Sequence, residues 1–300
     1  RFLKTVNKEK IDVMHFPNFN VPLMYTGNFV LTIHDMTPWK FPGPKVKKSK
    51  LRKFAYRMVF DSAIKRCEKL ITVSHHTKRE ILEKYPQYSD KIVVIYIGYG
   101  NSFHKCDDYG IIKSIKEKYN LDTSYIFYIG VWRDHKNIPG LLRAFHILVK
   151  EYGVNIKLVL GGDYKNSDPK ILRTISELKL EPFIIKTGYV PDNELSALYI
   201  MAELTVIPSF NEGFGMHAIE SISCHTPVAA SNTTSIPEIL GDSALYFDPS
   251  NPREMADVIR KIYENSNLKK NLVVRGLEVI KKYTWERCAE QTLGVYKKSK

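Results

Sequence analysis

The chain has 300 residues, of which 44% are hydrophobic and 12% aromatic, and a formal net charge of +13. This length and composition are typical of two globular domains, each with its own core, and exclude a disordered chain. No apolar run reaches the roughly 18 residues that a membrane-spanning helix needs. The positive charge favours an acidic partner, such as nucleic acid, anionic lipid or a phosphorylated small molecule.

The cysteines and the start of the chain bear on its compartment. The four cysteines lie far apart and form no C-x-x-C pair; they are Cys67, Cys106, Cys224 and Cys288. This spacing argues against a zinc site and a disulfide framework, and it favours a reducing cytosol. No signal peptide is recognisable, so we expect a cytoplasmic protein. The first residue is arginine and not methionine, which is consistent with a missing upstream part.

The first two-fifths of the chain alternate short apolar runs with helical patterns. Strands are predicted at 11–16, 28–33, 69–73 and 92–95, and this alternation is typical of a parallel sheet. His15, His34 and Ser74 fall at the carboxyl ends of these strands, where such sheets bind ligands. A single histidine there is more often structural, whereas two on one edge modestly favour a site.

A basic amphipathic helix is predicted within 45–66. Its cations are Lys45, Lys47, Lys48, Lys50, Arg52, Lys53 and Arg57, and its apolar side chains recur at helical spacing: Leu51, Phe54, Ala55, Met58, Val59 and Ala63. No nucleic-acid-reading motif accompanies the cations, so we expect no nucleic-acid partner. One interpretation is contact with an anionic membrane surface. The other is a solvated helix whose apolar stripe packs on its own sheet.

A second alternation follows a polar linker at about 101–112. Strands are predicted at 125–129, 156–160, 183–185, 204–207, 227–230 and 244–247. We therefore expect an α/β fold with two Rossmann-like domains of parallel strands. The predicted domains are 1–105 and 106–282, with a C-terminal helix at 283–300 that packs back toward the first domain.

Two loops of the second domain carry the residues best suited to bind an anion. Arg133 and Lys136 lie at the start of a helix that Asn137 is expected to cap, where positive charge is unfavourable unless an anion joins it. The segment 209–220 follows a strand and opens a helix, and its glycines expose backbone N–H groups. Its glutamates, Glu212 and Glu220, either serve a ligand or merely suit a helix start.

These groups together suit a nucleoside diphosphate that carries a further hydroxyl-bearing group. Two cations and a few N–H groups suffice for a diphosphate, Glu220 is free to accept from ribose hydroxyls, and Glu212 can accept from the hydroxyls of the attached group. The sequence has no D-x-D pair, so we expect no metal and no other cofactor, with the cations taking the place of a metal.

Four segments carry a family resemblance: G-x-W-R-D-H-K-N, T-G-Y-V-P-D-x-E-L, P-S-x-x-E-G-F-G-x-x-x-x-E and S-I-P-E-I-L-G-D-S-A. The set resembles family 4 retaining glycosyltransferases, and it is most similar to the mannosyltransferase-like branch that builds bacterial surface polysaccharides. The likeness covers nearly the whole chain. It implies the GT-B fold, with the active site in the cleft between the domains and the nucleotide sugar held mainly by the C-terminal one.

The resemblance also implies roles for individual residues. The implied catalytic residues are Glu212, which contacts the sugar, and His34. The implied donor-binding residues are Arg133, Lys136, Gly188, Tyr189, Val190, Gly213, Phe214, Gly215, Met216 and Glu220. His15, Pro17 and Asn18 would border the acceptor. The family acts with retention of configuration and without a metal, by front-face attack in which the leaving phosphate helps to deprotonate the acceptor.

The sequence departs from the family pattern in three places. His217 stands where proline is usual, close enough to alter the sugar preference, and Cys224-His225 replaces a small residue and glycine. In addition, the first domain has about four strands where six or seven are expected, so its N-terminal part is predicted to be missing.

The sequence thus predicts transfer of a hexose, with mannose from GDP-mannose as the first hypothesis, to a glycan or lipid-linked acceptor. The enzyme is expected in the cytoplasm, at the inner membrane face. Two alternatives remain: a non-catalytic donor-binding fragment or partner subunit, and a nucleotide-sugar epimerase on the same fold. The sugar, base, acceptor and oligomeric state do not follow from the sequence.

Overall fold

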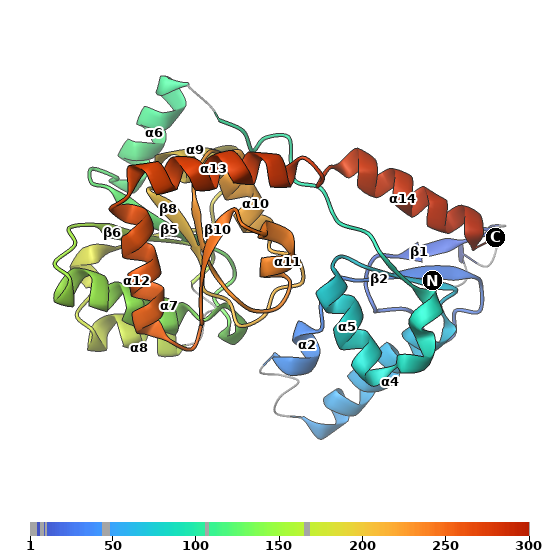
Figure 1. The fold of residues 1–300 in the computed structure, drawn as a ribbon. Coiled ribbons are helices and arrows are strands. Elements are labelled where there is room, and N and C mark those ends of the chain that lie inside the picture. The colour runs from blue at the N-terminus through green and yellow to red at the C-terminus, as the bar shows by residue number, and fades with distance from the viewer. Residues whose placement is uncertain are drawn as a thin grey trace. The chain divides into compact units, whose positions relative to one another are not determined.

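A computed structural model describes residues 5–6, 9, 11–43, 49–105, 108–164 and 169–299. The chain divides into two compact units, shown in Figure 1. Unit 1 contains Arg1–Gly98 and Tyr283–Lys300, and unit 2 contains Tyr99–Lys282. The boundary predicted from the sequence lies between 105 and 106. The C-terminal helix belongs to unit 1 in this division.

Unit 1 is built on a parallel four-stranded sheet with the order β1-β2-β3-β4. Its strands are β1 (Met14–Phe16), β2 (Phe29–Ile33), β3 (Lys69–Thr72) and β4 (Ile92–Val94). Its helices are α2 (Thr37–Lys40), α4 (Lys50–Arg66), α5 (His75–Lys84), the 3₁₀ helix η1 (Pro86–Lys91) and α14 (Trp285–Lys298). The strands follow one another across the sheet in chain order, so the order of the described strands never reverses.

The core of unit 1 explains why β2 forms at its centre. All five residues of β2 are buried, as expected for a central parallel strand that is covered on both faces. Phe29 and Leu31 pack with Phe60 and Ile64 of α4. On the other face, Val30 joins a cluster that contains Val295 of α14. The C-terminal helix therefore completes the core of this unit.

Unit 2 is built on a parallel six-stranded sheet. Its strands are β5 (Tyr125–Ile129), β6 (Lys157–Gly161), β7 (Ile184–Gly188), β8 (Leu204–Ile207), β9 (Val228–Ser231) and β10 (Ala244–Phe247). Its α-helices are α6 (Tyr109–Tyr119), α7 (Ile138–His146), α8 (Pro169–Glu177), α9 (Asp192–Met201), α10 (Met216–Ser223), α11 (Ile236–Leu240), α12 (Pro252–Tyr263) and α13 (Ser266–Ile280). Short helical turns are η2 (Asp134–Lys136), η3 (Ile147–Glu151) and η4 (Glu181–Phe183). The α/β fold with two parallel sheets, predicted from the sequence, is confirmed.

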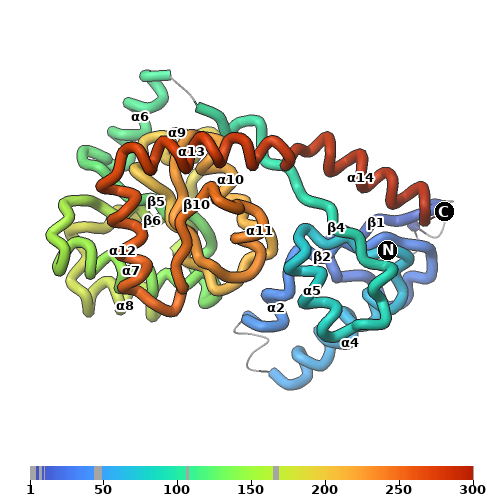
Figure 2. The backbone as a smooth tube through the Cα atoms, viewed as in Figure 1, coloured from blue at the N-terminus to red at the C-terminus, as the bar shows by residue number. Residues whose placement is uncertain are grey.

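The strand order of unit 2 locates its ligand-binding edge. The order is β10-β9-β8-β5-β6-β7, so the chain adds strands on one side of β5 and then returns to add the others beyond β8. Figure 2 shows the path of the backbone through these strands. Ligands of open parallel sheets bind at the carboxyl ends of the strands, where the order reverses. In this unit that point lies between β5 and β8.

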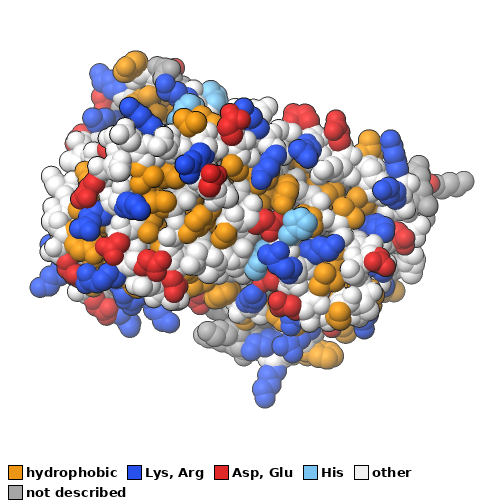
Figure 3. Space-filling model, in the orientation of Figure 1, with side chains coloured by type: hydrophobic (Ala, Val, Ile, Leu, Met, Phe, Trp, Pro, Cys, Tyr) orange, Lys and Arg blue, Asp and Glu red, His pale blue; other side chains and the backbone are white. Residues whose placement is uncertain are grey.

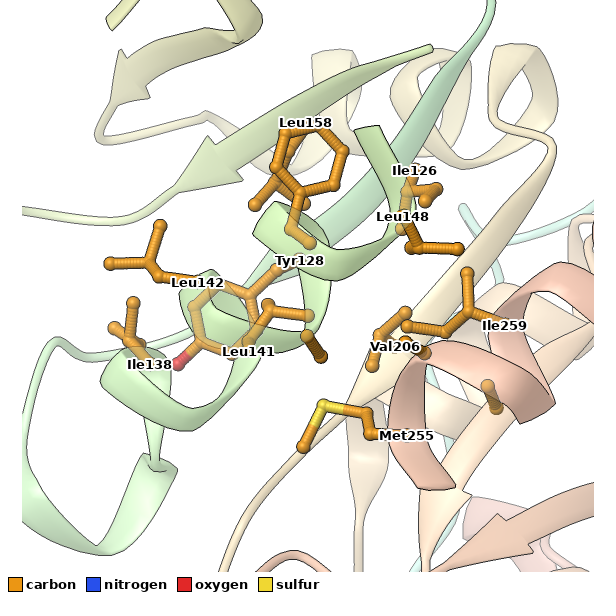
Figure 4. Close-up of a cluster of buried hydrophobic side chains, with 14 of the residues drawn as sticks. Ile126, Tyr128, Ile138, Leu141, Leu142, Leu148, Leu158, Val206, Met255 and Ile259 are labelled. Atoms are coloured by element: carbon orange, nitrogen blue, oxygen red, sulfur yellow. The ribbon is translucent and has the colours of Figure 1, made fainter. Parts of the chain in front are cut away.

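Strand β5 is buried on both faces, and this burial holds rigidly the edge of the sheet where the strand order reverses. Ile126 and Tyr128 face one hydrophobic cluster, and Tyr125, Phe127 and Ile129 face another. The first cluster takes its helical side chains mainly from α7, α8 and α12, as Figure 4 shows for α7 and α12. Fully burying one aliphatic side chain stabilises a fold by about 1.5–3 kcal/mol. The loop that follows β5 therefore starts from a well-anchored strand.

Several local predictions were wrong. The helix α6 begins at Tyr109, inside the predicted linker, and the short helix α11 begins at Ile236, where no helix was predicted. Both helices are supported by tertiary packing. Ile115 of α6 and Ile236 of α11, for example, are buried.

The predicted basic helix is α4, but its apolar stripe does not pack on the sheet along its whole length. Only Phe60, Ala63 and Ile64 near its end are buried. Leu51, Phe54 and Met58, in its first half, are exposed at 75%, 63% and 43%. Lys45, Lys47 and Lys48 of the predicted cluster lie outside the described residues. The interpretation that the whole stripe packs on its own sheet is therefore wrong for the first half of α4.

Candidate active site

The loops after β5 and β8 are joined directly at the point where the strand order reverses. The backbone N–H of Phe210 donates to the carbonyl oxygen of His135 at 2.8 Å. The buried amide of Asn137 donates to the carbonyls of Pro208, at 3.1 Å, and Pro249, at 2.7 Å. Asn137 precedes α7, as predicted, but its side chain does not cap the helix. It ties the loops together instead.

Lys136 and Glu212 form an ion pair across these two loops. Lys136 Nζ lies 2.7 Å from Glu212 Oε1, and Ser209 Oγ donates to the same oxygen at 2.7 Å. The side chains of Lys136 and Glu212 are 12% and 15% exposed. Lys136 therefore already has an anionic partner within the protein, so a bound anion is not needed to relieve its charge at this helix start.

The pKa of Glu212 reflects this pairing. Burial alone would raise the pKa of the carboxyl group, but the charge and hydrogen bond of Lys136 and the hydrogen bond from Ser209 outweigh burial and lower it. Glu212 is thus ionised near neutrality. Because its pKa is lowered on folding, the pair contributes stability above the unfolded pKa, and this contribution is lost as the pH falls through the lowered value.

The backbone of Glu212 is held by the loop after β9. Its N–H donates to Thr234 Oγ1 at 3.2 Å, and its carbonyl accepts from Ser235 Oγ at 2.9 Å. No role was predicted from the sequence for Thr234, Ser235 or Ser209. Ser235 begins the S-I-P-E segment. The run of hydroxyl residues just before that segment was the only sequence feature that could have indicated such hydrogen bonds.

The turn that opens α10 requires glycine at position 215. Gly215 has φ +92°, a left-handed conformation, and a Cβ placed there would lie 2.6 Å from Ile236 Cδ1. Beside it, Phe214 is buried, Gly213 is buried within the turn, and Met216 is half-buried at the first position of α10. The predicted strand, glycine turn and helix are confirmed as structure, and the donor-binding role of this turn stays a prediction.

Glu220 lies in the second turn of α10 and is nearly buried, at 7% exposure. Its Oε2 accepts from Tyr199 Oη at 2.9 Å and lies 2.9 Å from His217 Nδ1. Tyr199, on α9, was not predicted from the sequence, because nothing local distinguishes it from a core tyrosine. Glu212 and Glu220 are thus both anchored, by different neighbours.

The other predicted donor-binding residues lie at the same edge of the sheet. Arg133 is exposed in the loop after β5 and makes no side-chain hydrogen bond to the described part of the chain. Gly188 ends β7 with φ +73°, and its carbonyl accepts from Gly162 N at 2.8 Å. Tyr189 is 77% exposed, whereas Val190 is buried in the core. Among the described residues, no hydrogen bond or ion pair joins 188–190 to Lys136 or Glu212.

The predicted residues of unit 1 form a separate group. His34 follows β2, and its Nε2 donates to the carbonyl of Pro17 at 3.2 Å. His15 Nε2 lies 2.8 Å from Thr32 Oγ1, and its Nδ1 lies 2.5 Å from the hydroxyl of Tyr296. Burial and the neighbouring His34 lower the pKa of His15. His15 thus bridges β1, β2 and α14.

Asn18 and Pro17 are exposed beside this histidine pair. Asn18 accepts through Oδ1 from the backbone N–H of Asn20, at 3.3 Å, and from the Asn20 side chain, at 3.2 Å. The structure thus brings His34 and Pro17 together. The catalytic role of His34 and the acceptor-side roles of His15, Pro17 and Asn18 stay predictions.

Two further observations concern the chemistry of the chain. Among the residues that the structure describes, no group of three or more His, Cys, Asp or Glu side chains is placed to hold a metal ion. The described helices include none that combines the length and the apolar composition needed to cross a membrane.

The family of the chain follows from comparison with known sequences. Residues 112–278 match the family described as glycosyl transferases group 1, and residues 1–99 match the one described as Glycosyltransferase Family 4. The chain belongs to this family of glycosyltransferases, which confirms the resemblance predicted from its motifs and the class of enzyme.

Several curated relatives are mannosyltransferases. The chain is 32% identical over 288 residues to the O-antigen chain mannosyltransferase B of Escherichia coli, covering 95% of this chain and 74% of that protein. It is 31% identical to the O-antigen chain mannosyltransferase RfbU of Salmonella typhimurium, covering 87% of this chain and 66% of that one. It spans only 33% of the serotype-specific mannosyltransferase WbdA of Escherichia coli, at 27% identity.

Solved structures share the fold. Sucrose-phosphate synthase from Thermosynechococcus elongatus matches with a TM-score of 0.82 and 19% identity, over 99% of this chain and 76% of that one. Anabaena HepE, solved with UDP and glucose, matches with a TM-score of 0.74 and 16% identity, over 90% and 71%. At these identities the likeness concerns the fold alone. It agrees with the predicted GT-B class of two Rossmann-like domains.

Proposed function

We propose that this chain transfers mannose from GDP-mannose to a glycan or lipid-linked acceptor during synthesis of a cell-surface polysaccharide. The observation that carries the proposal is the Lys136–Glu212 ion pair beside the glycine turn of α10, at the point where the strand order of unit 2 reverses. The mannosyltransferase relatives favour mannose as the sugar.

The proposed roles follow from the chemistry of each group. Lys136, with the exposed Arg133, would neutralise the donor diphosphate, and backbone N–H groups at the start of α10 would bind its oxygens. Glu212 is ionised and would accept from sugar hydroxyls, while Glu220 would accept from the ribose. His34 is proposed as a catalytic residue near the donor sugar, and His15, Pro17 and Asn18 are proposed for the acceptor side. By the family resemblance, transfer retains the configuration and needs no metal.

The donor is identified by a thermal-shift screen against GDP-, UDP- and TDP-sugars in the presence of EDTA. We expect GDP-mannose to raise the Tm most, because binding to the native state alone stabilises it. The product formed on a lipid-linked mannoside acceptor should have the α configuration of the donor, as judged by NMR. A β-linked product, a requirement for a divalent cation, or an epimerised sugar formed without acceptor would contradict the proposal.

Replacement of Glu220 by alanine tests the nucleotide site. We expect Glu220→Ala to weaken GDP binding in calorimetry by about tenfold to a hundredfold, because a hydrogen bond to a charged group contributes about 1.5–3 kcal/mol. A matched control is Glu278→Ala on α13, since Glu278 is 67% exposed in a surface ion pair with Lys281. Equal GDP affinity in Glu220→Ala and wild type would show that Glu220 is not part of the nucleotide site.

We further propose that α4 binds an anionic membrane surface, which would place the enzyme at the cytoplasmic face beside a lipid-linked acceptor. Its first half exposes Leu51, Phe54 and Met58 among the exposed cations Lys50, Arg52, Lys53 and Arg57. Figure 3 shows basic and hydrophobic side chains together at this end of α4, at the lower edge of the view. At such a surface, burial of the apolar side chains favours binding, and each nearby cation contributes about 1 kcal/mol to the binding free energy.

Vesicle flotation tests this second proposal. We expect the protein to bind vesicles that contain phosphatidylglycerol and not vesicles of phosphatidylcholine, with binding reduced at high salt. The double variant Leu51→Ser, Phe54→Ser should bind at least about tenfold less. Val274→Ser is the control, because Val274 on α13 is also 63% exposed. Equal binding to both vesicle types, or an unaffected double variant, would contradict a role for α4.

A further inference from the structure

Glu220 is held by one of its two carboxylate oxygens. Both neighbours, Tyr199 Oη and His217 Nδ1, lie 2.9 Å from Oε2. The other oxygen, Oε1, accepts no hydrogen bond from the described part of the chain. It is not among the fully buried polar atoms without a partner, so it is reached by solvent. One oxygen is therefore fixed by the protein, while the other stays open to solvent and to a ligand.

Both neighbours are hydrogen-bond donors to this carboxylate. Burial, followed by the charge and hydrogen bond of Glu220, raises the pKa of Tyr199 well above its ordinary value, so its hydroxyl keeps its proton and donates it. His217 must carry a proton on Nδ1 to contact a carboxylate oxygen at this distance. Two donors on one oxygen restrain the rotation of the carboxylate about its last side-chain bond.

Tyr199 is a rigid support for this arrangement. It is fully buried, and its ring packs edge-on against Phe127 of β5, with ring centroids 5.3 Å apart. Its carbonyl accepts from Thr226 Oγ1 at 2.6 Å. The phenol therefore ties the orientation of Glu220 to the central strand of the sheet.

His217 is placed differently, since its side chain is 34% exposed on the first turn of α10. Its protonated form also helps to lower the pKa of Glu212. A single imidazole thus influences both glutamates of the proposed donor site, one by a hydrogen bond and the other by its charge.

We propose that His217 and Tyr199 are positioning residues that fix the carboxylate of Glu220, so that its free oxygen is directed to a hydroxyl of the donor nucleotide. This inference rests on the proposed function, and it adds the residues that set the affinity for the nucleoside part of the donor. Neither residue needs to touch the reacting atoms.

Calorimetry with GDP, or with UDP if the donor screen favours it, tests the proposal. His217→Leu removes the hydrogen bond and keeps a good helix former, whereas His217→Asn keeps a short side-chain amide that can donate. Tyr199→Phe removes only the hydroxyl. We expect His217→Leu and Tyr199→Phe each to weaken binding by about fivefold to tenfold, and His217→Asn to restore most of the loss.

Two comparisons separate positioning from a general structural effect. Inorganic pyrophosphate should bind wild type and His217→Leu alike, because it has no hydroxyl for Glu220. Replacing the nucleotide by its 2′,3′-dideoxy form should cost wild type more affinity than it costs His217→Leu. His225→Asn is the histidine control: His225 is exposed just after α10 at φ +62°, which asparagine tolerates, and its nucleotide affinity should equal that of wild type.

The outcomes are distinct for this inference and for the proposed function. If Glu220→Ala loses nucleotide affinity while His217→Leu and Tyr199→Phe keep it, the inference is overturned and the proposed function stands. An equal loss of pyrophosphate binding in His217→Leu also overturns the inference. If wild type binds none of the nucleotides, the proposed function fails and the inference fails with it.

Discussion

Replacing Lys136 by methionine is expected to weaken binding of the donor nucleotide by about a hundredfold and to destabilise unit 2. The binding loss follows because the ammonium group is the buried cation proposed for the diphosphate, and charge-assisted hydrogen bonds are the strong ones. The stability loss follows because Glu212, 15% exposed, is left as a buried charge without its cation. Removing one partner of a buried pair costs about 3–5 kcal/mol. Calorimetric titration and thermal unfolding measure the two effects.

A second substitution separates the two effects of Lys136. In Lys136→Met combined with Glu212→Gln, no unpaired buried charge remains, so we expect most of the lost Tm to return while nucleotide binding stays weak. Lys113→Met is the control, since Lys113 is 79% exposed in a 4.0 Å surface pair with Glu117, and such pairs contribute little. Recovery of nucleotide affinity in the double variant would show that Lys136 serves Glu212 and not the ligand.

The Lys136→Met variant should also alter the pH dependence of stability. With Lys136 present, the pKa of Glu212 is lowered, and stability from this group is lost only as the pH falls through that lowered value. Without the cation, burial dominates and raises the pKa. We therefore expect the acid limb of the Tm profile to flatten in the variant: the Tm difference from wild type is largest at neutral pH and shrinks as the pH falls, because protonation of Glu212 relieves its buried charge. An unchanged limb would contradict the assigned cause of the lowered pKa.

Replacing Gly162 by alanine is expected to have the largest effect on stability. Gly162 has φ +111°, and a Cβ placed there would lie 2.0 Å from the carbonyl oxygen of Gly130, far inside any real contact. The clash is with backbone, so no side chain can yield. We expect a loss of at least about 3 kcal/mol, or roughly 6–12 °C in Tm for a unit of this size. Because Gly130 opens the loop that carries Lys136, donor binding should weaken as well.

The matched control for this variant is Gly153→Ala. Gly153 has φ +69°, so alanine is also strained there, but nothing lies within 4 Å of the added Cβ. We expect it to lose only about 1–2 kcal/mol and to keep its nucleotide affinity. Similar losses of Tm in both variants would mean that backbone conformation, and not the close approach of the two loops, makes glycine necessary at position 162.

The strands and the site loops could be predicted from the sequence because their signals are local. A buried parallel strand appears as a short apolar run, as at Tyr125–Ile129, where all five residues are buried. The glycine turn before α10 is marked by Gly215, which the left-handed backbone requires. Family motifs lie in these same loops, so the sequence also identified the family, which the matches at 112–278 and 1–99 confirm.

Tertiary structure decided the features that depend on residues distant in the chain. Lys136 and Glu212 are 76 residues apart, and their pairing follows from the neighbouring positions of β5 and β8 in the sheet. Tyr199 resembles any core tyrosine until its hydroxyl is seen on Glu220.

By itself, then, the sequence determined the fold class, the family and the loops that carry the candidate site, since apolar runs and glycine turns are local. Only the tertiary structure decided which side chains pair in charge, which hold one another by hydrogen bonds and which remain exposed. The exposed first half of α4 is the clearest case. Its helical spacing favours an apolar stripe, but whether a stripe is covered depends on what the rest of the chain places against it.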